Sequence, residues 1–193
     1  MHKLFDVFNG MEFDEEAHSY TYLGTPMSGI TGIIGMYEKH TFPKGGKGEY
    51  KWLEAREEGS LIHRCIEMNL SDNATGEEIP PEAEYVLKYL KEKHPSAEVY
   101  SEVIVGDRRN YCSCIDILVR NGDEYYIYDI KTGKFLLASV KWQLGIYKKF
   151  LEDIGCKVVA TAVISTKIPA VIPVIPRTSK ECQELLDLYR SSL

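Results

Sequence analysis

Three consecutive strand-like runs in the second half of the chain constrain the fold more than any other feature. They are Glu98–Val105, Cys112–Val119 and Glu124–Lys131, and all three are rich in β-branched and aromatic residues. Only Asn121-Gly122-Asp123 separates the second run from the third, and Asn-Gly is a strong signal for a tight β-hairpin. Because short connections join antiparallel strands, the sequence predicts a three-stranded antiparallel unit.

Helical patterns flank this unit on both sides. Apolar spacing predicts a helix over Glu49–Leu70, and a second helix is expected to begin at Pro81, where the missing N–H costs little, and to end before Pro95. After the three strands, a helix is expected over Ser139–Ile154 and a further strand over Val158–Ser165. The order helix, three antiparallel strands, helix, strand predicts an α/β fold with a mixed sheet flanked by helices.

The two ends of the chain add smaller elements. Residues 18–23 alternate like a strand before a turn at Gly24-Thr25-Pro26, and Ser28 is placed to cap a short helix that reaches Glu38. Residues 170–176 carry two prolines, which predicts an edge strand, and an amphipathic helix is expected over residues 179–192. With 193 residues we expect one domain: residues 1–48 as an N-terminal elaboration, 49–165 as the core, and 166–193 as an edge strand and closing helix.

Two carboxylates and a lysine fall within the predicted hairpin. If Asn121-Gly122 forms a two-residue turn, Asp116 lies opposite Ile127, whereas a four-residue loop places it opposite Asp129. Side chains alternate with period two along a strand, so any even loop brings Asp116, Asp129 and Lys131 to one face of the sheet.

Like charges at this separation repel, and here they interrupt otherwise apolar strands. A hard divalent cation resolves the conflict, because carboxylate oxygens are the ligands that Mg²⁺ prefers. An adjacent ammonium group can orient a water or stabilise charge on a phosphoryl group. The alternative is a salt bridge on a solvated sheet face, which the neighbouring isoleucines and tyrosines disfavour.

These residues belong to a longer series of motifs. Ile115-Asp116 is followed by Asp129-Ile130-Lys131, and Glu102 lies upstream in the first strand. Gly59-Ser60-Leu61-Ile62-His63 lies on the preceding helix and Gln143-Leu144-Gly145-Ile146-Tyr147 on the following one. The series resembles the PD-(D/E)XK nuclease superfamily, particularly its RecB-like exonuclease branch and the single-domain, phage-type members similar to lambda exonuclease. One departure is that Ile115 stands where the family name has proline.

The resemblance implies a restriction-endonuclease-like core, a Mg²⁺ or Mn²⁺ cofactor and a role for each matched residue. The implied metal ligands are His63, Glu102, Asp116, Asp129 and the carbonyl of Ile130. The implied catalytic residues are Asp116, Asp129, Lys131, Gln143 and Tyr147. Lys131 would position or activate the water, and Gln143 and Tyr147 would order the site or contact the substrate phosphate. Alternatives remain for the accessory positions: His63 as a hydrogen-bonded helix residue, Glu102 as an exposed carboxylate, and Gln143 with Tyr147 as a packing face.

The five cysteines bear on cofactor and compartment. Some relatives hold an iron–sulfur cluster with cysteines gathered near the C-terminus, but Cys156 and Cys182 are widely spaced here, so we expect no such cluster. The first residues show no apolar signal-peptide stretch. We therefore expect reduced thiols in the cytoplasm of a bacterial or phage-infected cell, with no membrane association.

The formal net charge of −6 argues mildly against a nucleic-acid partner. The charge is unevenly distributed, however, because the segment from Lys131 to Lys149 holds five lysines and no acidic residue. A local positive groove can bind a phosphate backbone while the remaining surface is acidic. The candidate contacts to nucleic acid are Lys44, Lys47, Arg108, Arg109, Lys134 and Lys141, with merely solvated side chains as the alternative.

Together with the carboxylates and lysine of the hairpin, the resemblance implies a metal-dependent deoxyribonuclease, an exonuclease that acts on single- or double-stranded DNA ends in recombination, repair or phage DNA processing. Two alternatives remain: a non-catalytic nucleic-acid-binding or assembly module on the same fold, and a restriction-type endonuclease. The resemblance also leaves open a homo-oligomer or a recombination partner protein.

Overall fold

The computed structural model describes residues 8–14, 17, 19–38, 47–71 and 78–192, with the side chains of residues 47–58 outside that description. Within these ranges eight strands form one mixed sheet. The strands are β1 (Met11–Asp14), β2 (Ser19–Tyr22), β3 (Thr25–Gly29), β4 (Glu98–Gly106), β5 (Tyr111–Asn121), β6 (Glu124–Lys131), β7 (Lys157–Ser165) and β8 (Ala170–Pro173). The helices are α2 (Ile30–Tyr37), α3 (Lys47–Leu70), α4 (Pro81–Lys93), α5 (Leu137–Glu152) and α6 (Ser179–Arg190).

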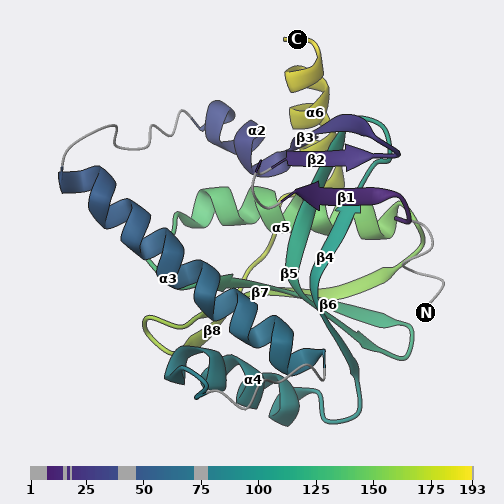
Figure 1. Cartoon of the computed structure of the whole chain (residues 1–193). Coiled ribbons are helices and arrows are strands. Elements are labelled where there is room, and N and C mark those ends of the chain that lie inside the picture. Colours follow the sequence, from purple (N-terminus) through teal and green to yellow (C-terminus); the bar gives the residue numbers. More distant parts are fainter. Residues whose placement is uncertain (1–7, 15–16, 18, 39–46, 72–77, 193) are drawn as a thin grey trace.

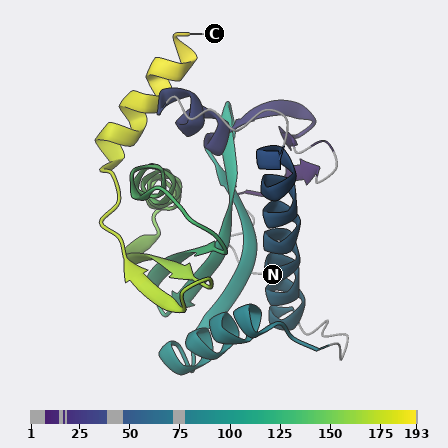
Figure 2. The same ribbon diagram turned by 90° about the vertical axis from the view of Figure 1, so that its left-hand side faces the viewer.

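The helices cover both faces of the sheet (Figures 1 and 2). Helices α3 and α4 pack on one face, where Ile66, Leu90 and Ile117 belong to one apolar core. Helix α5 packs on the other face with α2 and α6 outside it, and Leu118 and Ile146 belong to this second core. Because helices bury both faces, the central strands are apolar throughout rather than alternating, as expected for a covered sheet.

Strand β5 is the centre of the sheet and has an unusual set of partners. Strand β4 pairs antiparallel with β5 along nearly its whole length, from Cys112 to Arg120. The opposite edge of β5 is divided: β3 pairs in parallel with Tyr111 and Cys112, while β6 pairs antiparallel from Ile117 to Asn121. Among the described strands, none pairs with residues 113–116 on that edge. The sheet therefore has an opening in its middle.

Strands β6 and β7 are parallel, and α5 makes the crossover between them. This connection places the lysine-bearing end of β6 directly before the helix that carries Gln143 and Tyr147. Strand β8 then pairs antiparallel with β7 as the edge strand that the prolines predicted.

The predicted helices and central strands are confirmed to within a few residues, and the α/β class with a mixed, helix-flanked sheet is confirmed with them. The predicted position of the hairpin turn was wrong by one residue. Asn121 pairs with Glu124, so Gly122 and Asp123 form the turn, and Gly122 has a φ of +61°. The last pair is Ile117 with Tyr128, so continuing the register by one residue places Asp116 opposite Asp129. The sequence predicts this arrangement for a four-residue loop and not for a two-residue turn.

The N-terminal region differs more from the expectations. The turn after β2 is Leu23-Gly24, both with positive φ, and Pro26 lies within β3 rather than in the turn. Helix α2 begins after Gly29, which makes no side-chain cap, so the predicted capping by Ser28 was wrong. Strands β1 and β3 had no sequence prediction, because four or five residues are too few to establish a period.

Within the described residues, no helix has the length and apolar character needed to cross a membrane.

Gly145 is required by the packing of α5 against the segment that begins α6. A Cβ at this position would lie 2.8 Å from the carbonyl oxygen of Arg177 and 2.8 Å from Sγ of Cys182. By contrast, a Cβ at Gly35 in α2 would meet nothing within 4 Å.

We therefore expect Gly145→Ala to lower the free energy of unfolding by about 1–3 kcal/mol, because overpacking forces backbone and side-chain shifts. The matched control Gly35→Ala should instead raise it by up to about 1 kcal/mol, because alanine favours the helix. Urea unfolding of both variants measures the difference, and equal stability of the two would contradict this account of the α5–α6 contact.

Candidate functional site

The opening along β5 leaves backbone groups that side chains satisfy. Oδ2 of Asp116 accepts a hydrogen bond from the backbone N–H of Ile130 at 2.6 Å, where a regular ladder would use a carbonyl of β5. The hydroxyl of Tyr147 donates to the carbonyl oxygen of Cys114 at 2.6 Å. Because unpaired buried backbone groups are costly, these two side chains stabilise the opening.

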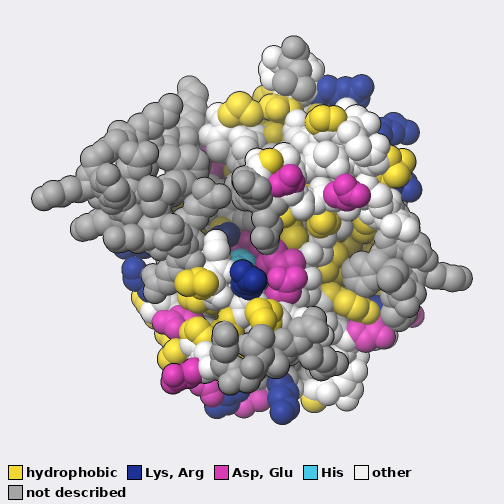
Figure 3. Space-filling model, in the orientation of Figure 1, with side chains coloured by type: hydrophobic (Ala, Val, Ile, Leu, Met, Phe, Trp, Pro, Cys, Tyr) yellow, Lys and Arg dark blue, Asp and Glu magenta, His cyan; other side chains and the backbone are white. Residues whose placement is uncertain are grey.

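Three potential metal ligands meet at the opening. Nδ1 of His63 lies 3.2 Å from Oε1 of Glu102 and 3.9 Å from Oδ1 of Asp116. One ligand atom from each of these residues lies within 4.8 Å of the others. In Figure 3, a histidine side chain lies among acidic and basic side chains near the centre of the face that α3 and β4 border in Figure 1.

Glu102 reaches this cluster through an irregular backbone. Its φ is +49° in the middle of β4, and the pairing with β5 omits it while including Ser101 and Val103. Such a conformation costs about 1–3 kcal/mol in a residue other than glycine and persists only where the surroundings impose it. The carboxylate also accepts a hydrogen bond from Sγ of Cys114 at 3.2 Å.

A second group of side chains lies on the α5 side of the same opening. Nζ of Lys131 donates to Oδ1 of Asp129 at 3.0 Å and to Oε1 of Gln143 at 3.3 Å. Nε2 of Gln143 donates to the hydroxyl of Tyr147 at 2.8 Å. A continuous chain of hydrogen bonds therefore joins the lysine to β5, and it fixes which way the Gln143 amide points.

The charges in the site interact strongly because they are removed from water. The pKa of Asp116 is raised to about 7. Burial is the main cause and the charge of Asp129 adds to it, whereas the charge of His63 lowers this pKa. Burial lowers the pKa of His63, but the charge of Asp116 and the bond to Glu102 outweigh it and raise this pKa to about 9. Burial also lowers the pKa of Lys131, yet the carboxylates of Asp129 and Asp116 raise it overall.

Gly59 allows α3 to approach the strand end that carries Lys131. A Cβ on Gly59 would lie 2.9 Å from Oγ1 of Thr132, the residue that follows the lysine. The glycine of the Gly59–His63 motif thus holds the helix close enough for His63 to face the carboxylates.

A cavity of about 730 Å³ opens onto this site. Its walls include residues for which the sequence analysis gave no role: Phe13 and Tyr20 from the β1–β2 hairpin, and Arg64 and Glu67 from α3. A signal existed for Glu67, which lies four residues after His63 on the same helix face. No pattern indicated the aromatic residues, because β1 was not predicted and the strand pattern over residues 18–23 does not show that Tyr20 reaches this cavity.

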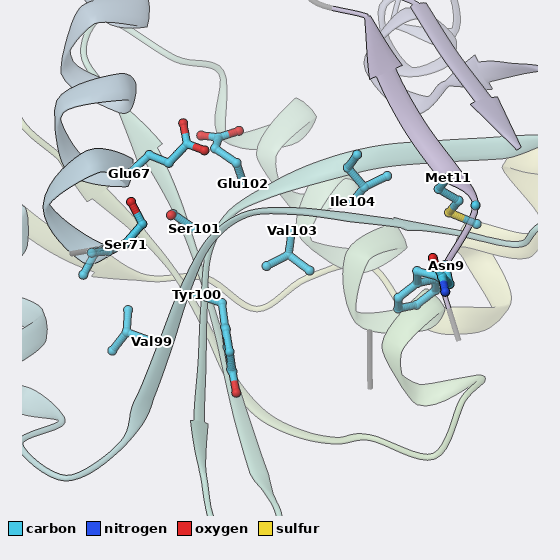
Figure 4. A pocket seen from close by; sticks show the side chains of 13 residues that line it. Asn9, Met11, Glu67, Ser71, Val99, Tyr100, Ser101, Glu102, Val103 and Ile104 are labelled. Carbon is cyan, nitrogen blue, oxygen red and sulfur yellow. The ribbon is translucent and has the colours of Figure 1, made fainter. Parts of the chain in front are cut away.

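A second cavity of about 510 Å³ shares Glu67 and Glu102 with the first and continues along β4. Figure 4 shows the two carboxylates facing each other from α3 and β4, with Ile104 farther along β4 and Met11 on the neighbouring β1. Apart from these two carboxylates, its lining is apolar or uncharged.

The structure thus brings together His63, Glu102, Asp116, Asp129, Lys131, Gln143 and Tyr147. The predicted nucleic-acid contacts are more dispersed. Arg108, Arg109 and Lys134 are exposed and Lys141 is half-buried. Lys44 and the side chain of Lys47 lie outside the described residues.

No protein-family model matches this chain, and a search of curated proteins finds no match either.

The donor set fits a divalent cation. Hard cations such as Mg²⁺ and Mn²⁺ favour carboxylate oxygens, and two of the three clustered residues supply them. Oδ2 of Asp129 is fully buried and, although 2.8 Å from Nζ of Lys131, has no hydrogen bond of suitable geometry within the described structure, so it retains capacity to accept. His63, Glu102 and Asp116 would hold the ion, with Asp129 beside them.

Cation binding at this cluster should depend on pH. His63 with a pKa of about 9 and Asp116 with a pKa of about 7 both hold protons near neutrality, and only their deprotonated forms bind metal. We expect the affinity for Mn²⁺ to rise with pH through both values, with about one to two protons released at pH 7. Calorimetry in buffers of different ionisation enthalpy measures that release.

His63→Gln should remove the component near pH 9, whereas Asp123→Asn in the exposed turn should leave the titration unchanged. An affinity independent of pH, or binding without proton release, would contradict the assignment of these ligands.

Proposed function

We propose that this chain is a Mg²⁺- or Mn²⁺-dependent nuclease that hydrolyses phosphodiester bonds in DNA, with a PD-(D/E)XK core of the RecB-like type. The observation that carries the proposal is the pairing of buried Asp129 with Lys131 beside the cluster of Asp116, Glu102 and His63, which lines one cavity. Carboxylates that hold a hard cation next to a fixed ammonium group are suited to phosphoryl transfer, in which catalysis is largely positioning and charge stabilisation.

A bound divalent cation would supply Lewis-acid polarisation of the scissile phosphate and a more acidic water. Lys131 stays protonated because its pKa is raised, so it acts as a donor rather than as a base. Held by Asp129 and Gln143, its ammonium group can orient the attacking water or stabilise negative charge on the phosphoryl oxygens.

Gln143 and Tyr147 act as positioning residues. Burial raises the pKa of Tyr147 far above its usual value, so its hydroxyl remains a donor to Cys114. This hydroxyl accepts from the Gln143 amide and thereby directs the amide oxygen towards Lys131.

In the reaction, the oxygen of water forms a bond to phosphorus while the bond to the 3′-oxygen breaks. One proton passes in net terms from the water to the departing oxygen, which leaves a 5′-phosphate and a 3′-hydroxyl. We propose action from DNA ends, in keeping with the resemblance to RecB-like exonucleases.

The test is a digestion series with end-labelled single- and double-stranded DNA, with Mn²⁺, Mg²⁺ and EDTA. Asp116→Asn keeps an oxygen that can accept from Ile130, and Lys131→Met keeps an unbranched side chain, so both variants should fold. Each should lose about 100-fold or more of the metal-dependent activity. Asp123→Asn and Lys157→Met, in exposed positions of the same sheet, are the matched controls.

Wild-type activity in both site variants would contradict the mechanism. Tight DNA binding without cleavage under any metal condition would favour the binding-module alternative. Cleavage of covalently closed circular DNA as fast as linear DNA would favour the endonuclease alternative.

A further inference from the structure

The larger cavity has an aromatic wall that the catalytic groups do not use. Phe13 of β1 and Tyr20 of β2 are directly paired in the hairpin, with ring centroids 4.6 Å apart. Both rings are half-buried and line the same cavity as His63 and Asp116.

A cation lies in the lining of the same cavity. Arg64 is exposed on α3, directly after His63, and no hydrogen bond or ion pair engages its guanidinium among the described residues. The other cations of the site are already held, Lys131 by Asp129 and Gln143 and protonated His63 by Glu102. Arg64 is therefore the cation that is available to a phosphate.

The two cavities that share Glu67 and Glu102 differ in what they can accept. The lining of the smaller cavity has no lysine or arginine, and its charged members are both carboxylates (Figure 4). No group in that lining would attract a phosphate backbone. The larger cavity also holds carboxylates, but it combines aromatic rings with an available arginine, which is the combination that binds single-stranded nucleic acids.

We propose that Phe13, Tyr20 and Arg64 form a subsite for an unpaired nucleotide of the DNA substrate, with the base against the rings and a phosphate at the guanidinium. The inference rests on the proposed function and specifies its substrate as a single-stranded or frayed end. A base inside a duplex is already stacked on its neighbours, so only an unpaired base presents a free face to these rings.

Binding in EDTA tests the subsite without cleavage. The probes are a fluorescent single-stranded DNA oligonucleotide, the same oligonucleotide made of abasic nucleotides, and a blunt duplex. Wild type should bind the intact single strand best. Phe13→Leu with Tyr20→Leu should weaken that binding about fivefold to 150-fold and leave the abasic probe unaffected, because only base stacking is lost.

Two further variants separate stacking from folding. Phe13→Leu alone keeps the Tyr20 ring and should give a smaller loss of the same kind. Tyr22→Leu lies on the same hairpin but outside the cavity lining, and it should bind all three probes like wild type. Equal weakening of the intact and abasic probes by the double variant would reveal a structural effect and overturn the proposal, as would unchanged binding.

Arg64→Gln should weaken both single-stranded probes and reduce the slope of log affinity against log salt by about 0.7, the value for one phosphate on a single strand. The double aromatic variant should leave the slope unchanged, and an unaltered slope in Arg64→Gln would remove the arginine from the subsite. Failure here is distinguishable from failure of the proposed function: cleavage with unaffected binding overturns only the subsite, and ring-dependent binding without cleavage overturns only the nuclease.

Discussion

The division of one edge of β5 between two strands is the constraint on which the site depends. Strand β3 pairs with the beginning of that edge and β6 with its end, so residues 113–116 face no described strand on this edge. The backbone groups left there would destabilise a closed core, but Asp116 and Tyr147 satisfy them with side-chain hydrogen bonds. Polar side chains thus enter the middle of an apolar sheet for a structural reason, and the same opening exposes them to a cavity.

That arrangement is electrostatically expensive without a ligand. Burial and the nearby charge of Asp129 both disfavour the ionised form of Asp116, so its pKa rises to about 7. Lys131 and His63 offset part of the repulsion, and the strained backbone at Glu102 adds another cost. Sites that combine perturbed carboxylates with local strain are typical of function, because a bound cation would compensate for these costs.

The sequence was most informative where a short-range rule applied. Period-two alternation and an even hairpin loop sufficed to place Asp116, Asp129 and Lys131 together, although the turn itself was misplaced by one residue. The resemblance implied that His63 and Glu102 belong to one site, and the structure places Nδ1 of His63 3.2 Å from Oε1 of Glu102 across 39 residues of chain. Neither strand alternation nor the helix motif predicts that Phe13 and Tyr20 line the cavity. They lie there because β3 pairs with β5, a long-range pairing that has no local sequence signal. The positive φ of Glu102 could not be predicted either, because glutamate is not a residue type that favours this conformation.

We propose that the opening in the sheet binds a divalent cation. Diffraction from crystals soaked in Mn²⁺, recorded at the manganese absorption edge, is the decisive measurement. We expect an anomalous peak within coordination distance of the Asp116 carboxylate, with His63 and Glu102 as neighbours, and its loss in Asp116→Asn crystals. Mn²⁺ bound elsewhere, or no peak in the opening at saturating Mn²⁺ and a pH above 9, would overturn this assignment.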